Sequence, residues 1–301
     1  MSLLLNAPQR EAIHYLDGPC LVLAGAGSGK TRVITQKIAY LITECGMSPH
    51  NIAAITFTNK AAKEMLERIT ALMGGRGVKG LTVCTFHAMG VRIVRQEAPL
   101  LGLKPQFSIL DASDTTQIIA ELTGNTDKNR AKALQWQISS WKNALIEPEE
   151  AAHRANDEIS SAAALLYRDY DKTLRAYQGV DFDDLIRLPV KLFDEHPEVR
   201  ERWQNKLRYL LVDEYQDTNR AQYRLLKLLA GVRAAFTAVG DDDQAIYAWR
   251  GADIENLRQL PVDFPSLRVI KLEQNYRSTT RILNAANTVI ANNEKLFEKK
   301  L

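Results

Sequence analysis

The sequence predicts an α/β fold in which a parallel sheet is covered by helices on both faces and is interrupted by an all-helical inserted subdomain. Two observations support this prediction. Short apolar runs alternate with helical patterns along most of the chain, as they do in parallel α/β sheets. Between about residue 105 and residue 200 the alternation stops, and only helical patterns remain.

Six apolar runs have the length and composition of strands that are buried on both faces of a sheet. They cover residues 20–24, 52–57, 81–86, 209–213, 236–240 and 268–272. Most of them precede a helical pattern, as at 30–44, 59–72, 87–98 and 219–230. Because strands that alternate with helices of this length form parallel sheets, the runs are expected to lie in one sheet.

The helical stretch in the middle of the chain is interpreted as a subdomain over residues 106–196. Its segments include "DTTQIIAEL" and "ISSAAALLYRDYDKTLRAY", and none of them is a convincing strand. The domain that contains the sheet is then discontinuous and consists of residues 1–105 and 197–276. Residues 277–301 are expected to begin a further domain.

Composition excludes several classes of protein. With 46% hydrophobic and 25% charged residues, the 301-residue chain has the balance of an ordinary globular protein. It has no run of about 18 apolar residues to span a membrane, and its start lacks the features of a signal peptide. Cys20, Cys45 and Cys84 are expected to be reduced thiols of a cytoplasmic protein. The net charge of +3 does not by itself indicate a nucleic-acid partner.

The segment "AGAGSGKT", residues 24–31, places a glycine-rich turn between a predicted strand and a predicted helix. Backbone N–H groups of such a turn surround phosphate groups at the helix N-terminus. In this chain those groups belong to Ala26, Gly27, Ser28 and Gly29. Lys30 is expected to neutralise the β and γ phosphates, and the Thr31 hydroxyl to bind magnesium. Ala24 replaces the first glycine of the strict pattern, which is a tolerated variation. The turn predicts ATP and Mg²⁺ as cofactors.

An acidic pair follows the predicted strand in "RYLLVDEYQDT". Asp213 is expected to hold magnesium, directly or through water, and Glu214 to polarise the attacking water. An acidic pair at a strand end is by itself as often solvated loop charge. Together with the phosphate turn it predicts ATP hydrolysis.

The stretch "VGDDDQAIYAWRGA", residues 239–252, combines three carboxylates, an amide and two aromatic rings. The three aspartates either bind a metal ion or, as we favour, cap a turn and orient Gln244. Tyr247 and Trp249 are interpreted as a surface that stacks on planar groups. The alternative for Trp249 is packing in the core.

Six motifs occur in order and together closely resemble those of superfamily 1 DNA helicases of the Rep, UvrD and PcrA group, most closely its Rep branch. They are "AGAGSGKT", "ITFTNKAAKEM", "TFHAMG", "LVDEYQDT", "VGDDDQAIYAWRGA" and "LEQNYRS". The resemblance runs from about residue 3 to the last residue. It implies a RecA-like P-loop fold and an ATP-dependent motor that moves 3′ to 5′ along single-stranded DNA. The discontinuous domain is then the first motor domain, and 277–301 is the start of the second.

The resemblance also implies roles for individual residues at the nucleotide. Gln9 corresponds to a glutamine that reads the adenine edge, and Arg32 and Tyr276 correspond to residues that sandwich the adenine ring. Gln244 reaches the γ-phosphate. Arg277 matches an arginine finger, which stabilises charge in the transition state.

Seven residues are expected to contact single-stranded DNA by the same resemblance. Tyr247 and Trp249 would stack on bases, a contact that tolerates any base sequence. The others are Thr56, Phe57, Asn59, Lys60 and His87. A histidine in this position is equally often a structural residue, so both interpretations of His87 stay open. None of the five histidines has the spacing of metal ligands.

The chain is expected to be an N-terminal motor fragment of a helicase that binds single-stranded DNA and its junctions with duplex, with replication or repair proteins as further partners. Two alternatives stay open. The parent protein is a helicase–nuclease of the RecB-like or AddA-like type, or the fragment binds nucleotide and single-stranded DNA without turnover. A small-molecule P-loop kinase does not require "DEYQDT" followed by "DDDQAIYAWRG".

Overall fold

The computed structural model describes residues 5–75, 78–124, 127–293, 296–297 and 299. The chain forms two compact units. The first consists of Met1–Thr85, Glu201–Thr218 and Leu229–Leu301, and the second of Phe86–Arg200 and Asn219–Leu228. These limits differ from those of the subdomain expected at 106–196, and the assignment of functional domains stays a prediction.

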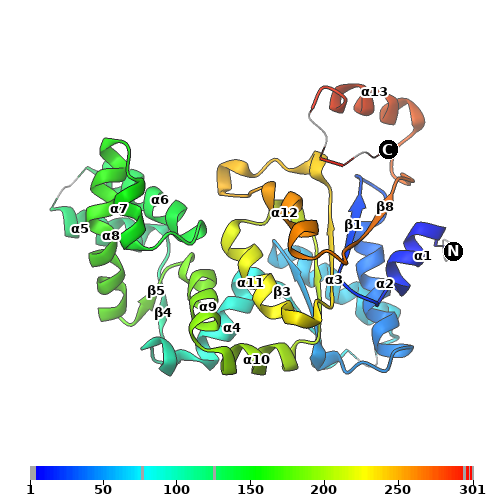
Figure 1. Cartoon of the computed structure of the whole chain (residues 1–301), viewed down its shortest axis with the longest axis horizontal. Helices are drawn as coiled ribbons and strands as arrows, with labels where there is room; N and C mark the ends of the chain where they lie inside the picture. Colours follow the sequence, from blue (N-terminus) through cyan, green and yellow to red (C-terminus); the bar gives the residue numbers. More distant parts are fainter. Residues whose placement is uncertain (1–4, 76–77, 125–126, 294–295, 298, 300–301) are drawn as a thin grey trace. The chain divides into compact units, whose positions relative to one another are not determined.

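The first unit is built on a six-stranded parallel sheet (Figure 1). Its strands are β1 (Cys20–Ala24), β2 (Ile52–Thr56), β3 (Thr82–Thr85), β6 (Tyr209–Val212), β7 (Phe236–Gly240) and β8 (Arg268–Leu272). They lie in the order β3-β2-β6-β7-β1-β8, and every neighbouring pair is parallel. All six expected strands are present, so the predicted α/β fold with a parallel sheet is confirmed.

Both faces of the sheet are buried, which explains why its strands are continuously apolar. On one face, alternate residues such as Cys20, Val22 and Ala24 pack in a core with the helices α1, α2 and α3. These helices span Ala7–His14, Lys30–Thr43 and Asn59–Leu72. On the other face, Leu21 and Leu23 are also buried. The α-helices α12 (Glu255–Asp263) and α13 (Thr280–Ile290) also belong to this unit, and α10 (Pro197–Lys206) contributes residues to both units.

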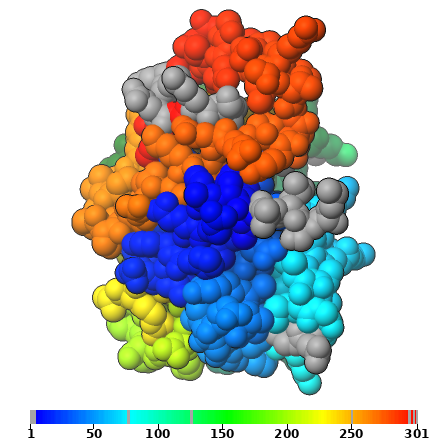
Figure 2. Space-filling view, turned by 90° about the vertical axis from the view of Figure 1, so that its right-hand side faces the viewer, coloured from blue at the N-terminus to red at the C-terminus, as the bar shows by residue number. Residues whose placement is uncertain are grey.

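The first helix lies beside the last strand of the sheet. In Figure 2 the dark blue N-terminal segment adjoins the orange segment that contains β8. The Arg268 guanidinium pairs with Glu11 at 2.6 Å, and the Asn6 amide donates to the Tyr276 hydroxyl at 3.0 Å. Asn6 is thereby held next to Tyr276, which follows β8 and lies 270 positions later in the sequence.

The second unit is mainly helical. It contains α4 (Phe86–Gln96), α5 (Ala112–Thr123), α6 (Lys128–Asn143), α7 (Pro148–Arg154), α8 (Glu158–Ala176), α9 (Asp184–Glu195) and most of α11 (Arg220–Ala230). It also contains two short parallel strands, β4 (Ser108–Ile109) and β5 (Gly179–Val180). The expectation of a stretch without strands was therefore wrong, because strands of two residues are too short to show a two-residue period.

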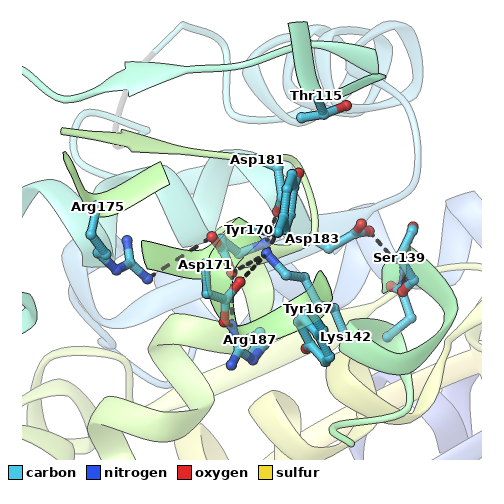
Figure 3. Close-up of polar contacts among 12 residues, drawn as sticks. Thr115, Ser139, Lys142, Tyr167, Tyr170, Asp171, Arg175, Asp181, Asp183 and Arg187 are labelled. Atoms are coloured by element: carbon cyan, nitrogen blue, oxygen red, sulfur yellow. Dashed lines mark hydrogen bonds and ion pairs between the residues drawn. The ribbon is translucent and has the colours of Figure 1, made fainter. Parts of the chain in front are cut away.

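A buried cluster of charges joins three helices of the second unit (Figure 3). The fully buried Lys142 of α6 donates to Asp181 at 2.7 Å and to Asp184 at 3.0 Å. Arg187 of α9 pairs with Asp184 at 3.2 Å and with Asp171 of α8 at 2.9 Å. Burial opposes ionisation of Asp184, but the cations of Lys142 and Arg187 lower its pKa to about 2. These ion pairs link the three helices, and the cluster is a structural feature of this unit.

Among the described residues, no helix is both long enough and apolar enough to cross a membrane.

Candidate nucleotide-binding site

The turn between β1 and α2 has the geometry of a phosphate-binding loop. Gly27 and Gly29 have φ values of 72° and 94°, in the left-handed region that glycine adopts without strain. A Cβ atom at Gly27 would also lie 2.5 Å from the Cβ of Arg277, so the segment after β8 approaches the turn closely. Ser28 is buried, and its hydroxyl donates to the Gly25 carbonyl at 2.7 Å. The Ser28 side chain therefore stabilises the turn itself.

A cavity of about 330 Å³ opens in front of this turn. It is lined by Ala26, Gly27, Gly29, Lys30, Thr31, Arg32, Arg68, Glu214, Gln244, Tyr276 and Arg277. All of these residues except Arg68 were expected at the nucleotide. They come from segments far apart in the sequence and meet because the carboxyl ends of parallel strands lie at the same edge of the sheet. Three expected residues, Gln9, Ser28 and Asp213, are buried beside the cavity lining and are not part of it.

The Lys30 ammonium joins the phosphate loop to two other strand ends. It donates to Glu214 Oε2 at 3.0 Å and to Gln244 Oε1 at 3.3 Å. Glu214 has a φ of 49°, which is unusual for a residue with a side chain. Such strained conformations concentrate at functional sites, where surrounding contacts hold them. The backbone thus directs the Glu214 carboxylate to the cavity.

The carboxylate before Glu214 has a different environment. Asp213 is buried at the end of β6 and accepts a hydrogen bond from the Glu214 N–H at 3.0 Å. Burial, together with the neighbouring Glu214 charge, raises the pKa of Asp213 to about 6. A nearby cation would therefore stabilise the ionised form of the Asp213 carboxylate. A hydroxyl at Thr31 and a carboxylate at Asp213 are oxygen ligands of the kind that Mg²⁺ prefers.

The segment at the start of α1 packs over the other side of the turn. The Gln9 amide donates to the Ser28 carbonyl at 3.0 Å and accepts from the Asn6 N–H at 3.2 Å. The same Asn6 holds the Tyr276 hydroxyl. Two residues expected at adenine, Gln9 and Tyr276, are therefore linked through one side chain next to the phosphate loop.

The loop after β7 carries the acidic and aromatic residues. Asp241 accepts from the Asp243 N–H at 3.2 Å and from the Gln244 amide, as expected of a residue that caps the turn. The three carboxylates of 241–243 surround the ammonium of Lys299, which lies 3.1 Å from Asp243. The hydrogen bonds that Asp241 accepts agree with the capping interpretation, and the three carboxylates also lie close enough together to hold a metal ion, so both interpretations stay predictions.

The aromatic residues of the same loop lie on the surface. Trp249 is 68% exposed and Tyr247 is 38% exposed, with their ring centroids 6.4 Å apart. The exposure contradicts the alternative that Trp249 packs in the core.

The chain matches the family model of the UvrD/REP helicase N-terminal domain over residues 5–265. The chain belongs to the UvrD/REP helicase family. The resemblance inferred from the six motifs is thereby confirmed.

Curated relatives in this helicase family are similar over almost the whole chain. The ATP-dependent DNA helicases Rep of Salmonella typhimurium and Escherichia coli are each 55% identical over 300 residues. The ATP-dependent DNA helicase PcrA of Bacillus subtilis is 50% identical over 301 residues. Each comparison covers 99% of this chain but only 44%, 45% and 41% of the respective relatives. The chain thus spans less than half the length of the helicases it matches.

The residues expected at DNA have mixed environments. Thr56 is buried at the end of β2, Phe57 is half-buried, and Asn59 and Lys60 are exposed in the first turn of α3. His87 belongs to the second unit, where its ring lies 5.3 Å from that of Phe182. Burial lowers the pKa of His87 and so disfavours its charged form. This favours a role without charge for His87, and the DNA contacts stay a prediction.

Arg68 of α3 lines the cavity but was not expected there. It follows "TFTNKAAKEM" by three positions, in a part of the helix that alternates charged and apolar residues. An exposed arginine in an amphipathic helix usually faces solvent, so the sequence offers no signal that separates Arg68 from its neighbours.

Proposed function

We propose that the full-length protein containing this chain is an ATP-dependent 3′–5′ DNA helicase and single-stranded DNA translocase, and that the chain supplies its first motor domain. One observation carries the proposal. A single cavity gathers the phosphate-loop lysine, Glu214, Gln244 and Arg277, and Gln244 belongs to the loop that exposes Tyr247 and Trp249. A nucleotide site and an aromatic surface therefore share one loop of about ten residues.

In this proposal each cavity residue has a distinct task. Lys30 leaves its contacts with Glu214 and Gln244 to bind the β and γ phosphates, and Arg277 stabilises charge that develops in the transition state. Glu214 accepts a proton from the attacking water. Thr31 and Asp213 would hold Mg²⁺, which neutralises phosphate charge when it is bound. Gln9, Arg32 and Tyr276 would contact the adenine.

The DNA side of the proposal rests on the exposed rings. Tyr247 and Trp249 would stack on successive bases of single-stranded DNA, and Thr56, Phe57, Asn59 and Lys60 would add further contacts. Duplex junctions, replication or repair proteins, and a cytoplasmic location are the finer predictions that accompany a helicase. The 301-residue chain by itself is proposed to bind nucleotide and DNA, with turnover requiring the rest of the protein.

The test is ATPase activity of the full-length protein with and without single-stranded DNA, compared with its Glu214→Gln variant. The wild type should hydrolyse ATP and be stimulated by DNA. Glu214→Gln should bind ATP with similar affinity and lose turnover, because the amide cannot accept the proton. Absence of DNA stimulation in a wild type that binds ATP would contradict the helicase. Nuclease activity in the same preparation would favour the RecB-like or AddA-like alternative.

A further inference from the structure

Five residues at the nucleotide site form a closed circuit of hydrogen bonds. Lys30 donates to Glu214 Oε2 at 3.0 Å and to Gln244 Oε1 at 3.3 Å. The Gln244 amide donates to Asp241 Oδ2. Gln216 closes the circuit, because its Nε2 donates to Glu214 Oε2 at 3.0 Å and its Oε1 accepts from the Asp241 N–H at 3.0 Å. Gln216 has no role in the mechanism derived above.

The Gln216 amide is held in a fixed position by its surroundings. Its residue is 2% exposed and lies in the short 3₁₀ turn Tyr215–Asp217, directly after the acidic pair. A Cβ atom at Gly240, the last residue of β7, would lie 2.8 Å from Gln216 Oε1. The amide therefore fits between the ends of β6 and β7 only because residue 240 is a glycine.

Gln216 gains importance when nucleotide binds. Among the described residues, both side-chain hydrogen bonds to the Glu214 carboxylate end on Oε2, one from Lys30 and one from Gln216. The Lys30 ammonium is the group that phosphates would recruit in the proposed function. The hydrogen bond from Gln216 then remains to orient the carboxylate, and Oε1 carries no side-chain hydrogen bond among the described residues.

The Oε1 atom of Gln216 binds the backbone at the start of the loop that carries Tyr247 and Trp249. Asp241 is the first residue after β7, and the loop continues through Gln244 to Tyr247 and Trp249. A displacement of this loop changes the position of the Asp241 N–H and hence of the Gln216 amide. Because the same buried amide bonds both the Asp241 N–H and Glu214 Oε2, such a change would reach the Glu214 carboxylate through one side chain.

We propose that Gln216 is a positioning residue that orients Glu214 for hydrolysis and couples it to the loop that carries Tyr247 and Trp249. This inference rests on the proposed helicase function. It predicts that Gln216 sets the degree to which DNA stimulates ATP hydrolysis, and that it contributes little to binding of either ligand.

The experiment measures ATPase of the full-length protein with the Gln216→Met variant, which keeps the side-chain length and removes both hydrogen bonds. The DNA-stimulated kcat should fall by about 10- to 100-fold, the factor expected for one hydrogen bond to a charged group. The ratio of DNA-stimulated to DNA-independent kcat should fall with it. The Kd values for ATP and for single-stranded DNA should stay within about twofold.

Thr237→Val is the matched control. Thr237 lies on β7, like Gly240, and its hydroxyl shares a buried hydrogen bond of 3.0 Å with Tyr209 that is not part of the circuit. It should retain the stimulation ratio. Gly240→Ala is a second variant, since it displaces the Gln216 amide without removing it; it should lower the ratio even if Gln216→Met fails to fold.

The outcomes separate the inference from the function beneath it. A wild type without DNA-stimulated ATPase contradicts the helicase function. If DNA stimulates the ATPase of the wild type, the helicase function stands and the variants test Gln216 alone. The role of Gln216 is then overturned if folded Gln216→Met or Gly240→Ala keeps the stimulation ratio, or if Thr237→Val lowers that ratio equally.

Discussion

The ammonium of Lys30 lies between Glu214 and Gln244 and faces the cavity with 11% of its side chain exposed. Lys30→Ala should abolish ATP turnover of the full-length protein and leave the fold intact, because it removes ligand contacts and no core packing. ATPase assays and thermal unfolding of the variant measure these two effects. Normal turnover in a folded Lys30→Ala protein would contradict the nucleotide site.

The exposed ring of Trp249 gives a second prediction at the scale of one residue. Trp249→Ala should weaken binding of single-stranded DNA by roughly 1–3 kcal/mol, the value of one base stack. The loss should be independent of base sequence, and the salt dependence should stay unchanged because no phosphate contact is removed. Fluorescence titrations at several salt concentrations measure both. In the control, Gln244→Ala, DNA affinity should persist while stimulation of ATPase is lost.

At the scale of elements, α1 and α2 are joined by a buried lysine. Lys37 is fully buried, and its Nζ donates to the carbonyls of Ala12 at 2.8 Å and Tyr15 at 2.6 Å, at the end of α1. Burial lowers the pKa of Lys37 to about 8, although the nearby thiols of Cys20 and Cys45 act in the opposite direction. The amine is therefore neutral in the folded protein at a pH where it is still protonated in the unfolded chain.

This depressed pKa fixes the sign of a pH effect. Between pH 8 and about 10.5 the unfolded chain binds more protons at Lys37 than the folded protein, so stability from this residue rises with pH. Relative to Lys37→Met, the wild type should gain up to about 3 kcal/mol of unfolding free energy across that window. Urea unfolding of both proteins at pH 7.5 and pH 10 measures the difference. If the difference in unfolding free energy between the two proteins did not change with pH, the lowered pKa of Lys37 would be contradicted.

The charge cluster of the second unit also concerns the packing of elements. Lys142→Met would leave the buried carboxylates of Asp181 and Asp184 without their shared ammonium. Removal of one partner from such a group costs about 3–5 kcal/mol. Lys172→Met, at an exposed lysine paired with Asp169 on α8, should change stability by about 0.5 kcal/mol or less. If the two variants lowered the free energy of unfolding equally in chemical unfolding, the stabilising role of the Lys142 cluster would be contradicted.

For the molecule as a whole, the sequence predicted what depends on local pattern. All six long strands were expected, because each is an apolar run and most of them precede a helical pattern, whereas β4 and β5 are too short to leave such a pattern. The cavity residues other than Arg68 were expected from the motifs and the family resemblance. Gln216 lies within "DEYQDT" and was still missed, because its bond to Asp241 exists only when β6 and β7 are neighbours. Strand order is a global property that no single motif contains.

The close approach at Gly27 has a mechanical meaning. Besides the contact with Arg277, the Tyr276 N–H donates to the Gly27 carbonyl at 3.0 Å, and the Asn275 amide donates to the Ala26 carbonyl. The backbone that is expected to surround phosphate is thus hydrogen-bonded to the segment after β8, which continues to α13. Because these hydrogen bonds connect residues 275 and 276 to the turn, a change in the shape of the turn on nucleotide binding is expected to displace the start of the segment that leads to α13.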